Sequence, residues 1–342
     1  MNAGLKVLAP GLHTTVQDLG RLGYQAIGVP VSGALDGFSL QLANALVGNS
    51  PRTPALEVLM SGPTFEVAAD TVRVALAGVG ANLAIGAEKA RISAGQSVTL
   101  PRGAVIEVVA GQSASGYLAV EGGIAVPRVL GSTSTYVRAA IGGLDGRALR
   151  RGDFVPLAIA HASERAELRL PLPLMPTGDQ PIRVVLGPQQ EYFTEEAVAA
   201  FLLAEFRISQ SADRMGMRLD GPFLQHRGGW DIVSDAITTG AIQVPGSGQP
   251  ILLLADHQTT GGYPKIATVI SADLPVVGRR RPGDRLRFAA VTVEVAEELC
   301  RAAEYHLAEL AAKLEPISDH PAIDLGSLYD GNLISGVVSG VE

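Results

Sequence analysis

Residues 251–270, "ILLLADHQTTGGYPKIATVI", indicate two strands with a polar interruption between them. The runs at 252–255 and 266–270 are apolar and partly β-branched, as strand residues tend to be. A hairpin needs only about two to five linking residues, whereas residues 256–265 all lie between these runs. We therefore expect the interruption to do more than reverse the chain, within a fold built mainly from β-strands.

The interruption combines side chains that suit acid–base chemistry and the stabilisation of oxyanions. Asp256 is a candidate to orient or deprotonate a substrate, Lys265 to stabilise negative charge, and Tyr263 is the third candidate catalytic residue. The residues expected to position an amide substrate, or to let backbone amides approach it, are Gln258, Thr260, Gly261 and Gly262. The alternative is a polar loop that only joins two strands. His257 has no metal-ligand partner at a recognised spacing, so we expect no metal site.

Composition favours a β-rich chain with a few helices. Of the 342 residues, 47% are apolar, and 40 glycines and 21 prolines predict many turns. This length corresponds to about two domains of roughly 150 residues each. Strand-like runs occur at 72–78, 90–100, 104–111 and 116–124, and again at 182–188, 241–245, 251–255, 266–270 and 285–295. Their short, regular spacing predicts a barrel or a sandwich.

Capping signals predict two helices, and an apolar stripe at helical spacing predicts a third. Asp36 precedes a helix that ends near Gly48, Thr194 precedes one that runs to about Ala204, and the third spans about 294–314. The Pro-rich stretch 161–181 lacks sustained periodicity and marks the predicted domain boundary. The predicted divisions are an N-terminal β domain at 1–170, a C-terminal β domain at 171–300, and a helix end with a tail at 301–342. A short strand is expected at 333–338 in that tail.

Charge and cysteine content exclude several classes of protein. The formal net charge is −7, which argues against a nucleic-acid binder because such proteins need a basic face. The basic run at 279–281 is expected to form a solvated turn, and the alternative is an anion site. The single cysteine, Cys300, allows no disulfide framework and fits a reducing compartment. Without a signal-peptide pattern or an apolar run of about 18 residues, we expect a cytoplasmic protein with no membrane span.

A second polar segment, residues 11–24, is a candidate for substrate binding. Its candidate residues are His13, Thr14, Gln17, Asp18 and Arg21. The alternative is a solvated loop, or an Asp18–Arg21 pair that only fixes a turn.

A third segment, residues 209–222, contains Arg214 and Arg218. These two would share a face if the segment were helical, and their guanidinium groups could then clamp a carboxylate or phosphate. The alternative is a set of ion pairs with Asp213 and Asp220. Because convergent polar groups on an apolar scaffold mark binding sites, we predict that at least two of the three segments line one concave surface.

Several long motifs occur in the order found in one known family. They are "HTTVQDLGRLGY" (13–24), "GVPVSGALD" (28–36), "SADRMGMRLDGP" (211–222), "GAIQVPGSGQPILLLADHQTTGGYPKIATV" (240–269) and "RPGDRLRF" (281–288). From about Gly11 to Phe288 the chain resembles the KipA-like family, which includes the C subunit of 5-oxoprolinase and is also called allophanate hydrolase subunit 2. The same module resembles part of the carboxyltransferase region of urea carboxylase.

The resemblance implies two cyclophilin-like β-barrel domains and a hydrolase that works as part of a complex. The implied partners are the KipI-like B subunit of 5-oxoprolinase and its A subunit, and the implied reaction is ATP-dependent opening of 5-oxoproline to glutamate. ATP is therefore the expected cofactor, handled together with the partner subunits, because the sequence shows no recognisable ATP loop. We expect the chain to be inactive alone.

Two other functions remain open. One is a biotin-dependent carboxyltransferase component, and only this alternative involves biotin. No biotinyl-lysine "MKM" occurs in the chain, so the biotin would come from another protein. The other is a non-enzymatic regulator that binds a KipI-like kinase inhibitor.

Overall fold

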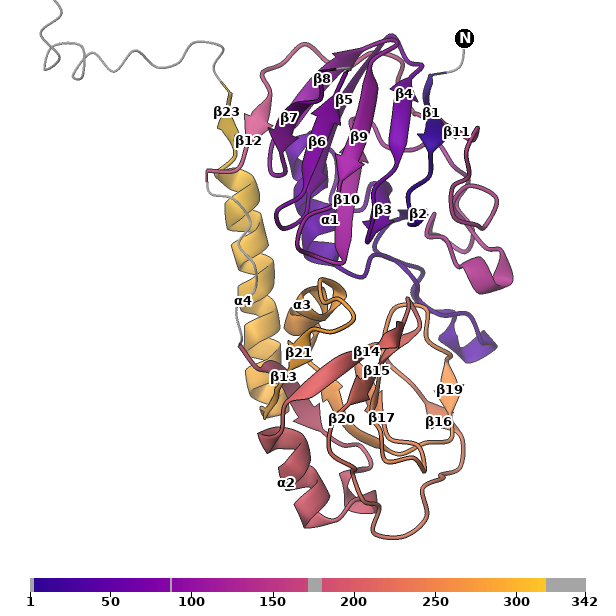
Figure 1. Ribbon diagram of the computed structural model, residues 1–342, viewed down its shortest axis with the longest axis vertical. Helices are drawn as coiled ribbons and strands as arrows, with labels where there is room; N and C mark the ends of the chain where they lie inside the picture. The colour runs from indigo at the N-terminus through magenta and orange to yellow at the C-terminus, as the bar shows by residue number, and fades with distance from the viewer. Residues whose placement is uncertain (1–2, 87, 172–179, 318–342) are drawn as a thin grey trace, which may run out of the picture.

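The protein consists mainly of β-strands arranged in two units that follow one another along its long axis (Figure 1). The computed structural model describes residues 3–86, 88–171 and 180–317. The large sheets of the first unit are formed within residues 4–156, and the large sheet of the second within residues 182–290. The expectation of a mainly β fold with a few helices is confirmed.

The first unit contains two antiparallel sheets. The six-stranded sheet has the order β11 (Phe154–Pro156), β1 (Gly4–Ala9), β4 (Thr64–Val67), β9 (Val105–Val109), β6 (Asn82–Ile85), β7 (Ala90–Ser93). The five-stranded sheet has the order β2 (His13–Gln17), β3 (Ala55–Leu59), β10 (Ser115–Val120), β5 (Thr71–Ala77), β8 (Ser97–Pro101). Leu5, Phe65 and Leu118 belong to the apolar core shared by the two sheets. Side chains alternate between the faces of a strand, so each sheet contributes every second residue to this core.

Helix α1 (Gly37–Leu46) covers the outer face of the five-stranded sheet. Asp36 caps it as predicted, because its carboxylate accepts a hydrogen bond from the backbone N–H of Ser39 at 3.0 Å. Leu40 and Leu46 share an apolar cluster with Tyr117. Two 3₁₀ turns, η1 (Gln25–Ile27) and η2 (Val137–Ala139), lie in the loops of this unit.

The second unit is one eight-stranded sheet. Its order is β21 (Arg285–Leu286), β14 (Phe206–Ala212), β15 (Gly216–Asp220), β18 (Ile251–Leu253), β17 (Ala241–Gln243), β20 (Lys265–Val269), β13 (Ile182–Leu186), β22 (Phe288–Ala290). The two edge strands, β21 and β22, are separated in sequence by Arg287 alone, so the sheet curls until its edges almost meet. Strands β13 and β22 pair in parallel. The predicted barrel is thus present here, and the cyclophilin-like relationship stays a prediction.

Helix α2 (Glu195–Leu203) closes one side of this barrel. Thr194 caps it as predicted, accepting a hydrogen bond from Ala197 N–H. Phe201 stacks on Phe288 with the ring centroids 4.7 Å apart. The remaining short elements are η3 (Gln190–Tyr192), β16 (Asp235–Ala236) paired with β19 (Thr260–Gly261), η4 (Ser271–Asp273) and α3 (Leu274–Gly278).

Two predicted strands are corrected by the structure. The run at 285–295 contains two short strands, β21 and β22, and the first residues of helix α4 (Val293–Ala312). The helix begins there because the Thr292 hydroxyl accepts a hydrogen bond from Val295 N–H. The run at 90–100 is two strands, β7 and β8, separated by a turn in which Gly95 has φ +90°. The predicted last helix is confirmed as α4, and the expected division at 300/301 lies inside it. The expected strand at 333–338 lies outside the described residues.

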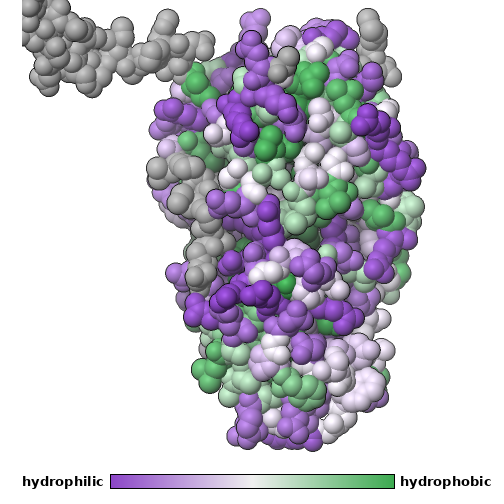
Figure 2. All heavy atoms as spheres, viewed as in Figure 1, coloured by the Kyte–Doolittle hydropathy of each residue, from purple (hydrophilic) through white to green (hydrophobic). Residues whose placement is uncertain are grey.

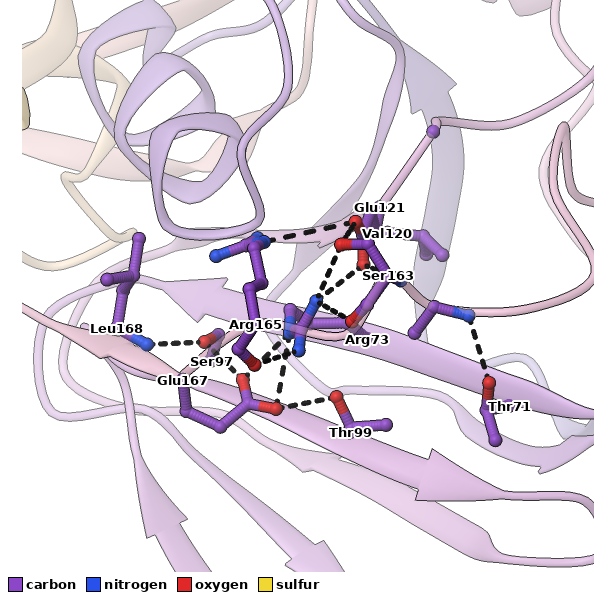
Figure 3. Close-up of polar contacts among 12 residues, drawn as sticks. Thr71, Arg73, Ser97, Thr99, Val120, Glu121, Ser163, Arg165, Glu167 and Leu168 are labelled. Carbon is purple, nitrogen blue, oxygen red and sulfur yellow. Dashed lines mark hydrogen bonds and ion pairs between the residues drawn. The ribbon is translucent and has the colours of Figure 1, made fainter. Parts of the chain in front are cut away.

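The stretch that precedes the second unit is fastened to the first unit by Arg73 (Figure 3). Arg73 lies on β5, is 2% exposed, and forms ion pairs with Glu121 at 2.8 Å and Glu167 at 3.0 Å. It also donates to the carbonyl oxygens of Ser163 and Arg165. The Pro-rich segment therefore belongs structurally to the first unit up to β12 (Leu168–Arg169), and the domain boundaries themselves stay predictions.

Helix α4 runs alongside both units (Figure 1). It contacts α1, η4 and β13, and β23 (Glu315–Pro316) beyond it pairs with β12. The chain thus returns from the second unit to the first. Within the described ranges, each helix is too short or too polar to serve as a membrane span.

Figure 2 shows hydrophilic and hydrophobic residues interspersed over the face seen in Figure 1.

The basic run at 279–281 joins the two units and is not the solvated turn that we expected. Arg279 forms an ion pair with Asp36 at 2.5 Å, and its carbonyl accepts from Ala114 N–H at 2.8 Å. Arg281 donates to the carbonyl of Ser113 at 2.9 Å. Carboxylate and carbonyl oxygens of the first unit thus replace the water that an isolated turn would bind.

Candidate functional site

Arg214 occupies the turn between β14 and β15 and reaches into the first unit. It is 5% exposed. Its Nε and Nη2 bind both carboxylate oxygens of Asp256, at 2.8 and 3.1 Å, and Nη1 binds Glu57 of β3. Nη2 also donates to the carbonyl of Gly33 at 2.7 Å. Burial lowers the pKa of Arg214, but the charges of Glu57 and Asp256 outweigh burial and raise it above its ordinary value.

This environment corrects the expected role of Arg214. The segment is a β-hairpin, so Arg214 and Arg218 do not share a helical face. Arg214 also pairs with Glu57 and Asp256 instead of Asp213 or Asp220. Its donors are occupied by the protein itself, so it holds the two units together.

Glu57 extends the network through the first unit. Its carboxylate accepts from the Tyr117 hydroxyl at 2.6 Å and from Leu35 N–H at 2.9 Å. The Tyr117 oxygen accepts in turn from Asp36 N–H at 2.8 Å. Burial, together with the nearby carboxylates, raises the pKa of Tyr117 well above its ordinary value, so the hydroxyl stays protonated and donates. Glu57 was not identified as a site residue from the sequence. The signal was available, because a single acid within the apolar run "ALEVL" (55–59) indicates a buried carboxylate.

Asp256 and Lys265 are both buried and both engaged. The two oxygens of Asp256 face Arg214, which leaves the carboxylate poorly placed to act as a free base. The Lys265 ammonium forms an ion pair with Asp235 at 2.7 Å and donates to the carbonyl of Ala236 at 3.1 Å. Lys265 thereby fixes the β16–β19 pair over the end of β20.

A groove of about 440 Å³ lies beside this network. Segments 209–222 and 256–265 both line it, as predicted for at least two of the three polar segments. Its polar lining includes Arg138, Asp213, Arg218, Gln243, Gln258 and Tyr263. A second hollow of about 510 Å³ shares Arg218 and Tyr263 and extends to Trp230. Together they form a continuous depression, called the Tyr263 groove below.

An amide pair forms the floor of the Tyr263 groove. Gln258 Nε2 donates to Gln243 Oε1 at 3.4 Å, and Gln243 Nε2 donates to the carbonyl of Tyr263 at 3.2 Å. Trp230 packs near Tyr263 with the ring centroids 6.1 Å apart. The exposed groups in the groove include the guanidinium groups of Arg138 and Arg218, the carboxylate of Asp213, the phenol of Tyr263 and the amide of Gln258, which can orient a small planar substrate. Sequence reasoning missed Gln243 and Trp230.

One glycine of the polar interruption, Gly261, is required by packing within the protein. A Cβ on Gly261 would lie 2.6 Å from Ile237 Cδ1 and 2.8 Å from Gln243 Nε2. Thr260 and Gly261 form β19. Close packing against Ile237 and Gln243 thus explains Gly261, whereas a Cβ on Gly262 would fit at 3.4 Å from the carbonyl oxygen of Ile232. Thr260 is exposed at the edge.

The segment at 11–24 reaches the same interface from the first unit. His13 lies on β2, and burial followed by the charge of Arg214 lowers its pKa below 6.5. Its Nδ1 is buried without a hydrogen-bond partner. Gln17 is fully buried and donates to the carbonyl of Thr135 at 3.1 Å, whereas Thr14 bonds locally to the carbonyl of Pro10.

Asp18 and Arg21 do not form the turn-fixing pair considered above. Asp18 accepts from Ser132 Oγ at 2.6 Å, from Ser134 Oγ, and from Thr133 N–H at 2.8 Å. Burial would raise the pKa of Asp18, but these hydrogen bonds outweigh burial and hold it below 3.8. Arg21 donates instead to the carbonyl of Ser134.

The three polar segments therefore meet near Asp256. The charges of Asp256 and Arg214 act on His13, and that of Asp256 also acts on Arg21. Spacing alone could not reveal this convergence, because it depends on how the first unit sits on the second.

Comparisons with known proteins agree with this architecture. Residues 27–290 match the family model for the carboxyltransferase domain, subdomains A and B. The chain is 35% identical over 305 residues to the C subunit of 5-oxoprolinase from Haemophilus influenzae, covering 87% of this chain and 94% of that protein. It is also 35% identical over 316 residues to the C subunit of 5-oxoprolinase from Escherichia coli, covering 91% and 98%.

A solved structure shows the same fold inside a larger protein. The K. lactis urea amidolyase superposes with a TM-score of 0.83 at 29% identity, over 94% of this chain and 21% of that one. The extent of these matches is decisive, and the chain belongs to the carboxyltransferase subdomain A and B family that includes the C subunit of 5-oxoprolinase.

Proposed function

We propose that this protein is the C subunit of an ATP-dependent 5-oxoprolinase, a cytoplasmic hydrolase that opens 5-oxoproline to glutamate with its A and B subunits. The observation that supports this most is the extent of the match to the C subunits of two 5-oxoprolinases, which covers 94% and 98% of their length. The match to urea amidolyase covers only 21% of that chain.

The Tyr263 groove supplies groups that suit a lactam. A lactam is a planar amide, and its opening places negative charge on the carbonyl oxygen. Donors aimed at that oxygen lower the barrier. In the proposal Tyr263 and Gln258 position the amide, while Arg218 provides a positive charge at the rim of the groove. Asp256 acts by holding Arg214 and therefore the interface, so it is a positioning residue.

The described residues do not fit a nucleotide phosphate site of a recognised kind. The glycine-containing turn at 246–248 is the segment most similar to a phosphate-binding loop. A Cβ on Gly246, however, would lie 2.8 Å from the ring of Trp230. A Cβ on Gly248 would meet the ring of Phe223 at 2.4 Å. These glycines make room for aromatic rings. We therefore assign ATP to the partner subunits.

Reconstitution tests the proposed function. The A and B subunits and this chain are purified separately and together, and glutamate and phosphate release are measured with 5-oxoproline and ATP. We expect activity from the complete assembly and none from this chain alone or from the other two proteins without it. Strong activity of the isolated chain would overturn the proposal of a joint enzyme.

The alternative is a carboxyltransferase component, favoured by the family model and the urea amidolyase fold. Carboxyl transfer from biotin to urea, in a complex that leaves 5-oxoproline intact, would establish it. Binding of a KipI-like protein without either activity would instead support a regulator.

A further inference from the structure

Arg21 is a buried cation whose hydrogen-bond donors are mostly unused. It is 1% exposed. Nη2 donates to the carbonyl of Ser134, whereas Nε and Nη1 are buried without a partner. A guanidinium carries five N–H donors, and Nε and Nη1 together hold three of them. Leaving buried donors unpaired is costly, so such groups in a native fold call for an explanation.

Neighbouring carboxylates do not neutralise this cation by direct contact. Asp18 accepts from Ser132, Ser134 and Thr133, and both oxygens of Asp256 are taken by Arg214. Arg214, which is also buried, has protein partners on Nε, Nη1 and Nη2. The contrast indicates that Arg214 is structural, whereas Arg21 is kept for an anion that the chain does not provide.

Gln17, whose side chain binds the same loop as Arg21, carries an unpaired acceptor. The Oε1 atom of Gln17 is buried without a partner, while its Nε2 donates to the carbonyl of Thr135. Arg21 and Gln17 thus bind two consecutive carbonyls, those of Ser134 and Thr135. Gly142 makes room for the guanidinium, since a Cβ there would lie 2.9 Å from Arg21 Nη2.

We propose that Arg21 binds the carboxylate of 5-oxoproline and that Gln17 Oε1 accepts the hydrogen bond of its lactam N–H. This inference rests on the proposed function. In 5-oxoproline the carboxylate and the ring nitrogen are attached to the same carbon, so one ligand can satisfy both side chains. A urea-type amide has no carboxylate. Arg21 therefore sets specificity for an anionic lactam.

In this proposal the substrate reaches the pair from the Tyr263 groove. The charge of Asp256 acts on Arg21, and Gln258, two residues further along the chain, lines the groove. Arg138 and Asp213 approach to 3.9 Å with side chains that are 61% and 64% exposed. A pair this exposed is weak, so it opposes entry of the substrate little.

Substrate preference in the complete three-protein assembly is the test. The measured quantity is kcat/KM for 5-oxoproline divided by kcat/KM for 2-pyrrolidinone, the same lactam without the carboxylate. A site built to bind a polar group rejects an analogue that lacks it by about 10⁴-fold. We expect Arg21→Met to reduce the preference to within about tenfold by lowering kcat/KM for 5-oxoproline alone. Arg21→Lys, which keeps the charge but not the planar fork, should fall between. Arg91→Met, on the exposed strand β7, is the control.

Thermal unfolding of this chain without substrate gives a second readout. Arg21→Met removes an unpaired buried charge, so the variant should unfold at the same or a higher temperature than the wild type. Marked destabilisation of both Arg21 variants would mean that Arg21 is structural and would overturn the inference.

The outcomes also separate the inference from the proposed function. If the wild-type complex opens 5-oxoproline and Arg21→Met keeps the wild-type preference, the assignment of Arg21 is wrong and the function stands. If the wild-type complex does not open 5-oxoproline, the proposed function is wrong and this inference falls with it. Should Arg21→Met fail to assemble, the preference of Arg21→Lys decides.

Discussion

Arg214 in the second unit forms a buried ion pair with Glu57 in the first, and this pair is one of several contacts that join the two units. The same guanidinium binds Asp256 at 2.8 Å. Water is excluded from all three side chains, so each charge relies on the others. The polar interruption that begins at Asp256 is thereby fixed relative to β3, across the boundary between the units.

Arg214→Met should destabilise the protein strongly. Removal of one partner leaves Glu57 and Asp256 buried without their cation, and breaking such a pair costs about 3–5 kcal/mol. Unfolding in urea, followed by circular dichroism, measures the loss. Arg285→Met, which breaks an exposed pair with Glu205, is the matched control and should change stability little. Equal midpoints for both variants would contradict a structural role of Arg214.

Tyr263→Phe and Asp256→Asn should distinguish a residue that contacts the substrate from one that holds Arg214 in place. Tyr263 is exposed in the groove, so its variant should lower turnover by the complex without a change in melting temperature. Asp256→Asn should lower both, because it weakens the contact with Arg214. Turnover is measured in the reconstituted complex and melting in the isolated chain. An Asp256→Asn variant with wild-type stability and activity would show that Asp256 has no positioning role and only forms part of a loop.

Gly278→Ala should loosen the contact between α3 and the first unit. An added Cβ would lie 2.4 Å from the carbonyl oxygen of Leu35, which is backbone and cannot rotate away. Overpacking of this kind costs about 1–3 kcal/mol, measurable as a lower urea midpoint. Gly228→Ala, where nothing lies within 4 Å, is the control. A wild-type midpoint for Gly278→Ala would show that the two units tolerate a wider separation.

Stability should fall as the pH drops below 6.5, in part because of His257. Burial lowers its pKa in the folded state below the ordinary value of 6.5. As the pH falls through 6.5, the unfolded chain takes up a proton that the folded chain does not, so unfolding becomes easier. The urea midpoint of unfolding is measured at pH 7.5 and at about pH 5.5 for the wild type and for His257→Gln. The decrease between the two pH values should be smaller for the variant. Parallel decreases would exclude His257 as a contributor.

Local chemistry determined much of the fold. Asp36 and Thr194 begin their helices because a short acceptor side chain can cap free backbone N–H groups, and that interaction needs only neighbouring residues. The runs at 182–188 and 266–270 became strands for an equally local reason. Residues 285–295 could not be divided in advance, because β-branched residues also occur at the start of a capped helix.

The sequence by itself determined that three polar, glycine-rich segments are interspersed in an apolar β scaffold, and its motifs identified the family. Only the tertiary structure decided which charged residues are partnered. Arg21 and Arg214 look alike in sequence, yet Arg214 meets Asp256 and Glu57, whereas Arg21 keeps Nε and Nη1 unpaired. The physical reason is distance in the chain: Glu57 and Arg214 lie 157 residues apart, and only packing of one unit on the other brings their charges together.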